Sequence, residues 1–198
     1  LLLMIIAYAF SIAVRLIWVI QFQGNPSFQW QDQLMINTND GYYFASAAQH
    51  VLEGWHNHNP QIPGALASYP GIVYITVFLT TALPFSLNTV ILYMPVFISS
   101  LVVIPVILIG RLFNMTQIRF FAALLGSIGW SYYNRTMVGY YDSDMFAVLM
   151  QYAILYTLLA TVIQRKLTYA IAAFVFIVSY PYLYPQGIAL LFAMYLLV

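Results

Sequence analysis

The chain has 198 residues, of which 63% are hydrophobic and only 6% are charged, whereas soluble domains average about 25% charged residues. This composition excludes a soluble globular protein and predicts an all-α integral membrane protein that crosses the bilayer several times. The chain contains no cysteine, so disulfides, thiolate metal sites and thiol nucleophiles are excluded as well.

Apolar runs that can cross a bilayer recur along the chain. The first covers residues 1–22, close to the roughly 20 residues that a span requires. Further spans are predicted over residues 88–112, 120–133, 145–163, 167–182 and 187–198. We expect Pro95 and Pro105 to kink the second span. Because the first and last runs reach the two ends of the sequence, we expect a fragment of about six spans with the last one truncated.

Between the first two spans, residues 23–87 form a long polar connection, and long ordered connections are usually functional. Within it, residues 41–52 are predicted to form a helix with Asp40 as its N-cap and Gly54 at its end. The apolar run 71–83 is too short for a span and predicts an interfacial or re-entrant helix.

Charged residues divide between the two sides of the membrane that these spans define. The acids all fall in connections on one side: Asp32, Asp40, Glu53, Asp142 and Asp144. Most of the basic residues fall in two short connections on the opposite side: Arg111, Arg119, Arg165 and Lys166. Because Lys and Arg collect on the cytoplasmic side, the acidic connections are expected to face outward.

The connection between the third and fourth spans carries a candidate metal site. Asp142 and Asp144 can converge on one cation, and Asp40 is a third candidate ligand on the same side. Carboxylates about 4 Å apart repel by roughly 1 kcal/mol in water and about 4 kcal/mol near a protein surface. A divalent cation or the nearby Arg135 must offset this repulsion, and an all-oxygen site favours Mg²⁺ or Mn²⁺ over Zn²⁺. Acids before a helix are also typical of simple caps, so spacing alone leaves both interpretations open.

Three other polar residues invite a functional interpretation. His56 precedes a turn predicted over residues 57–64, and His58 lies within it. Alternate histidines in such a Pro-rich segment are expected to be solvated rather than metal ligands. Arg15 lies inside the first span, where a charge costs about 2.5–3.5 kcal/mol on insertion scales. We therefore expect Arg15 to reach outward to the membrane surface or to pair with an acid such as Asp32.

Sequence motifs around these acids resemble a known family. They are Asn37-Thr-Asn-Asp-Gly-Tyr-Tyr-Phe-Ala45, then Leu124-Leu-Gly-Ser-Ile128, then Ser131-Tyr-Tyr-Asn-Arg-Thr-Met137 with Gly139-Tyr-Tyr-Asp-Ser-Asp144. Together with the apolar runs between them, the motifs make the chain similar to the catalytic subunit of oligosaccharyltransferase in its bacterial single-subunit form. The likeness runs in order through nearly the whole chain.

This resemblance implies a type C glycosyltransferase-like fold in which Asp40, Asp142 and Asp144 hold Mg²⁺ or Mn²⁺ and Arg135 steadies the acidic cluster. It implies inverting transfer of an oligosaccharide from a polyprenyl diphosphate to the Asn side chain of Asn-x-Ser/Thr acceptor proteins. It also implies a multi-pass protein of the bacterial inner membrane whose active site faces the periplasm. The family's later catalytic carboxylate and acceptor-reading soluble C-terminal domain are not in this chain, so the fragment alone is expected to be inactive.

Two alternatives to this function remain. One is another polyprenyl-linked sugar transferase of the same fold that uses a different acceptor, and it would lack the family's acceptor-reading Trp-Trp-Asp signature. The other is a cation transporter, which predicts ionisable residues at mid-membrane. Apart from Arg15, the predicted spans contain none there, which disfavours the transporter.

Overall fold

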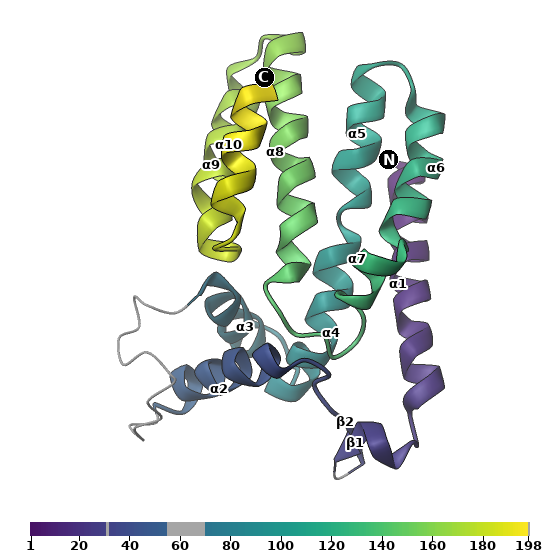
Figure 1. Ribbon diagram of the computed structural model, residues 1–198, viewed down its shortest axis with the longest axis vertical. Coiled ribbons are helices and arrows are strands. Elements are labelled where there is room, and N and C mark those ends of the chain that lie inside the picture. The colour runs from purple at the N-terminus through teal and green to yellow at the C-terminus, as the bar shows by residue number, and fades with distance from the viewer. Residues whose placement is uncertain (31, 55–69, 198) are drawn as a thin grey trace.

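The computed structural model describes residues 1–30, 32–54 and 70–197, and this part of the chain is almost entirely helical, as its composition predicts (Figure 1). The expected turn over residues 57–64, with His56 and His58, lies outside the described residues. The helices in chain order are α1 (Leu2–Phe22), α2 (Asn39–Glu53), α3 (Gly71–Ala82), α4 (Leu87–Ser100), α5 (Val103–Leu112), α6 (Thr116–Ser127), α7 (Trp130–Asn134), α8 (Asp144–Gln164), α9 (Leu167–Leu183) and α10 (Gly187–Leu197).

A small hairpin that the sequence analysis did not predict follows α1. It begins with a short 3₁₀ helix (Pro26–Phe28) and pairs the antiparallel strands β1 (Gln29–Trp30) and β2 (Gln33–Leu34). Strands of two residues are too short to show the alternating pattern from which a strand is predicted.

Helices in the described residues differ in whether they are long enough to cross a membrane. Three apolar helical stretches are long enough: Leu2–Phe22, Leu87–Leu112 and Asp144–Gln164. The apolar helices α3 and α9 are shorter. At about 1.5 Å per residue, the 12 residues of α3 cannot cross a hydrocarbon core of about 30 Å.

Two breaks in the helices have identifiable causes. Between α4 and α5 the helix is interrupted at Leu101 and Val102, one turn before Pro105, whose ring clashes with the carbonyl four residues earlier. That carbonyl, on Leu101, instead accepts a hydrogen bond from the Ile104 amide at 3.0 Å. Pro95 lies inside the continuous α4. The apolar run 120–133 is likewise divided, into α6 and α7, next to a glycine at position 129.

The helices form two groups that stand side by side in Figure 1, with α1, α5 and α6 in one and α8, α9 and α10 in the other. The hairpin, α2, α3 and the connection from α7 to α8 gather at one end of these helices. The short turns from α5 to α6 and from α8 to α9 lie at the opposite end. The acid-bearing segments therefore share one end, and the turns with most of the basic residues share the other.

A hydrophobic core extends from the helices into the acid-bearing end. It combines residues of α2, α3, α4 and α8 with Tyr141, which is completely buried. The Tyr141 hydroxyl hydrogen-bonds the Thr76 hydroxyl on α3 at 2.5 Å. The chain is thus anchored in the core at the residue immediately before Asp142.

Candidate active site

Two segments about 100 residues apart in the sequence meet at the acid-bearing end. The backbone N–H of Asn37 donates to the Gly139 carbonyl at 3.0 Å. The Asn37 side chain donates from Nδ2 to the Val138 carbonyl, also at 3.0 Å, across a separation of 101 residues. The amide of Gly139 donates in turn to the Leu92 carbonyl of α4 at 2.9 Å. These bonds join the segment before Asp40 to the segment before Asp142.

Two glycines permit this close approach. A Cβ atom added to Gly41 would lie 2.9 Å from the Tyr141 carbonyl oxygen and closer still to Ile36. A Cβ atom added to Gly139 would lie 2.9 Å from the Met35 carbonyl oxygen, and Gly139 also has a φ of +80°, which side chains disfavour. Each glycine therefore removes a clash with the backbone of the opposite segment.

Asp40 and Asp142 lie on these two segments. Asp40 is exposed in the first turn of α2. The prediction that Asp40 is the N-cap is wrong, because the helix begins earlier, after Thr38. Asp142 accepts a hydrogen bond at Oδ1 from the Ser143 hydroxyl at 3.1 Å. Burial raises the pKa of the Asp142 carboxyl, and the negative charges of Asp144 and, to a smaller extent, Asp40 raise it further. The charge of Asp40 therefore acts on Asp142 from the opposite segment.

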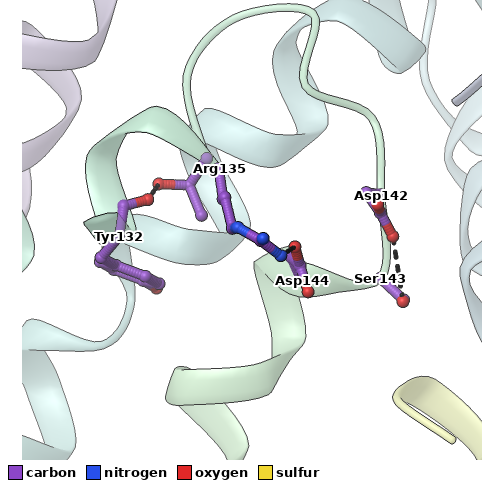
Figure 2. Close-up of polar contacts among 6 residues, drawn as sticks. Tyr132, Arg135, Asp142, Ser143 and Asp144 are labelled. Carbon is purple, nitrogen blue, oxygen red and sulfur yellow. Dashed lines mark hydrogen bonds and ion pairs between the residues drawn. The ribbon is translucent and has the colours of Figure 1, made fainter. Parts of the chain in front are cut away.

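Asp144 is the first residue of α8, and its partner is Arg135. Arg135 Nη1 donates to Asp144 Oδ2 at 2.9 Å, and this hydrogen bond raises the pKa of the guanidinium. Figure 2 shows Arg135 extending toward Asp144, with Ser143 and Asp142 beyond it. The carboxylate is 15% exposed and the arginine 62% exposed, so the arginine contacts solvent while it neutralises a largely covered acid.

Two tyrosines that the sequence analysis did not assign to the site lie beside it. Burial raises the pKa of the Tyr184 phenol, at the end of α9, and the negative charge of Asp144 adds to this effect. The pKa of Tyr140 is also raised by burial first, while the charge of Arg135 opposes the rise. Tyr140 could have been suggested by its place in the Gly139-to-Asp144 motif, whereas nothing near Tyr184 in the sequence links it to the acids.

The acids fit a divalent cation by their chemistry. Carboxylate oxygens are the ligands that Mg²⁺ and Mn²⁺ prefer. Burial first, and then the neighbouring negative charges, raise the pKa of Asp142, and a bound cation would favour its ionised form. Asn37 Oδ1 is buried without a hydrogen-bond partner in the described part of the chain. No three His, Cys, Asp or Glu side chains there are already arranged around a metal position, and Asp144 is engaged by Arg135. Asp40 and Asp142 are thus the better candidate ligands.

The raised pKa of Asp142 predicts a pH-dependent stability. Because this pKa is higher in the folded protein than in the unfolded chain, the carboxyl contributes stability when protonated, and that contribution is lost as the pH rises through the raised pKa. Without divalent cations, Asp142→Asn should therefore raise the Tm of the full-length protein slightly at pH 7. It should leave the Tm unchanged at about pH 3, below the ordinary pKa of Asp. A lower Tm for the variant at pH 7 would contradict this. Thermal denaturation in detergent measures both values.

Comparisons with known proteins found a matching family and similar sequences. The family described as Oligosaccharyl transferase STT3, N-terminal, matches residues 3–198. Two relatives from strains of Campylobacter jejuni, each named undecaprenyl-diphosphooligosaccharide-protein glycotransferase, are 38% identical to the chain over 188 residues. The match covers 94% of this chain and 26% of each relative, so the chain spans about a quarter of the length of these relatives.

Proposed function

The chain belongs to the oligosaccharyl transferase STT3 family, and from this premise we propose that it forms the N-terminal, membrane-embedded part of an oligosaccharyltransferase. The full-length protein would transfer an oligosaccharide from a polyprenyl diphosphate to the side-chain nitrogen of Asn in Asn-x-Ser/Thr acceptors. The observation that supports the proposal is the contact between the two motif segments that carry Asp40 and Asp142, across which the charge of Asp40 acts on Asp142.

The acids suit the chemistry that this transfer requires. A carboxamide nitrogen is a weak nucleophile because its lone pair is delocalised into the carbonyl. Carboxylates that accept the N–H hydrogens would orient the amide for attack on the anomeric carbon and would take up the proton it loses. As the new C–N bond forms, the C–O bond to the diphosphate breaks, and the configuration at the anomeric carbon inverts.

Asp40 and Asp142 would hold a divalent cation in this site. Such a cation, when bound, supplies positive charge that stabilises a departing diphosphate. Asp144 and Arg135 would form the edge of the site, where their ion pair offsets part of the Asp144 charge that acts on Asp142.

A lipid-linked donor requires a site at the membrane surface. The described helices and the family show a membrane protein. We infer that about six spans cross the bacterial inner membrane and that the acid-bearing end faces the periplasm. This orientation is supported by the basic residues near the turns at the opposite end, since Lys and Arg collect in cytoplasmic connections.

The test uses the full-length protein in detergent with a lipid-linked oligosaccharide and a fluorescent peptide that contains Asn-x-Thr. We expect transfer that EDTA abolishes and Mn²⁺ restores. A peptide with Gln in place of Asn is the matched control and should receive nothing. Transfer that EDTA leaves unchanged would contradict the metal site, and transfer to lipid or hydroxyl acceptors alone would favour a different polyprenyl-linked sugar transferase.

A further inference from the structure

Arg15 of α1 is completely buried, and its position contradicts both expectations for it, since it neither reaches the membrane surface nor pairs with Asp32. Its guanidinium donates from Nη2 to the Ser127 carbonyl at 2.8 Å and from Nη1 to the Ser11 hydroxyl at 2.7 Å. Nη2 and Nε also donate to the Thr136 hydroxyl, at 2.9 and 3.1 Å. Within the described residues, Arg15 contacts no carboxylate.

A buried charge without a counter-ion is costly, so the groups that surround it must compensate. Ser127 is the last residue of α6, where carbonyl groups lack partners within the helix and the helix dipole favours a cation. The Tyr132 ring adds a cation–π contact, with its centroid 5.3 Å from the guanidinium carbon. Arg15 is thus matched to dipoles and a ring rather than to an acid.

These contacts hold both ends of the segment that contains α7. Ser127 precedes the segment and Thr136 ends it, so one guanidinium fastens both ends to α1. The Thr136 hydroxyl also donates to the Tyr132 carbonyl at 2.6 Å, which closes the segment on itself. The geometry therefore restrains the backbone on either side of α7.

Arg135 is the residue immediately before Thr136. Thr136 is completely buried, whereas the Arg135 side chain is 62% exposed. Among the described residues, the ion pair with Asp144 is the one contact that holds the Arg135 guanidinium. We propose that Arg15 is a positioning residue for the candidate active site, which it serves by fixing Thr136 so that Arg135 meets Asp144. This inference rests on the proposed function only where it is tested by measuring transfer.

A double-mutant cycle in the full-length protein tests whether Arg15 acts through Arg135. We expect Arg15→Gln to lower kcat for transfer by about tenfold, with little change in the KM of the acceptor peptide, because coupled residues give non-additive effects of this order. In an Arg135→Ala background, the same substitution should lower kcat less than about twofold. The control is Tyr8→Phe, which removes a different hydrogen bond between α1 and α4, to the Phe97 carbonyl, and should show the same small effect in both backgrounds. Equal fold-losses for Arg15→Gln in both backgrounds would overturn the proposal.

Cross-linking provides a readout that does not require transfer. In an Arg135→Cys, Asp144→Cys variant, a bifunctional thiol reagent should join the two positions. Mass spectrometry of the linked peptide gives the rate. We expect Thr136→Val, which removes the hydroxyl that Arg15 contacts, to slow this reaction, while Thr136→Ser restores it. Equal cross-linking rates for the Val and Ser variants would overturn the proposal for Arg15. Absence of oligosaccharide transfer by the full-length protein would instead overturn the proposed function, so the two failures can be told apart.

Discussion

Asp142→Asn is expected to reduce oligosaccharide transfer by the full-length protein by about two to three orders of magnitude, the usual effect of removing one electrostatic contact to a reacting group. The substitution keeps the size of the side chain and removes its charge. Asp142 is the acid whose ionised form is held in a partly buried position beside two other negative charges. Its charge is therefore the one that a cation or the acceptor amide would compensate most strongly.

The matched control for this variant is Asp32→Asn. Asp32 is an exposed acid in the hairpin turn at the same end of the molecule, and Asn tolerates its φ of +62°. Initial rates with a fluorescent acceptor peptide should be unchanged in the control. An Asp142→Asn enzyme that retained more than about a tenth of the parent rate would contradict the assignment of Asp142, because a loss of less than about tenfold is below the expected range.

Gly41→Ala is expected to have the second largest effect, because it separates the two motif segments. The added methyl would lie 2.9 Å from the Tyr141 carbonyl oxygen, and backbone cannot move aside as a flexible side chain can. Overpacking of this kind costs about 1–3 kcal/mol of stability. A displacement of about 1 Å between Asp40 and Asp142 would lower transfer by roughly a hundredfold.

Gly126→Ala is the control for this variant. Gly126 lies in α6, and beyond its chain neighbours and the adjacent backbone of its own helix, no described atom lies within 4 Å of the place where its Cβ would be. This substitution should leave transfer unchanged and should stabilise the helix slightly, since Ala has the higher helix propensity. Rates and Tm should be measured together on both variants. If the Gly41→Ala variant transferred oligosaccharide at the parent rate and responded normally to EDTA, the site would not depend on the close approach of Gly41 to the Tyr141 carbonyl.

Much of the fold and most residues of the candidate site can be predicted from the sequence alone. Helices and membrane character follow from local composition and from the length of apolar runs, because each helix satisfies its own backbone hydrogen bonds. The residues of the candidate site were also recognisable, since Asp40, Arg135, Asp142 and Asp144 lie in two short motifs. Their catalytic and metal-binding roles remain proposals.

Tertiary structure decided how these residues are paired. Local composition does not predict that Arg135 forms an ion pair with Asp144. That the charge of Asp40 acts on Asp142, and that Tyr184 at the end of α9 lies beside Asp144, depends on how segments distant in sequence pack. Arg15 shows the limit most clearly, because the cost of a charge in a span was predictable but its neutral partners on other helices were not. The local pattern of apolar and polar residues determines which segments become helices. Contacts between residues a hundred positions apart depend instead on how closely the backbones can approach, as at Gly41 and Gly139, and this selects one packing among many.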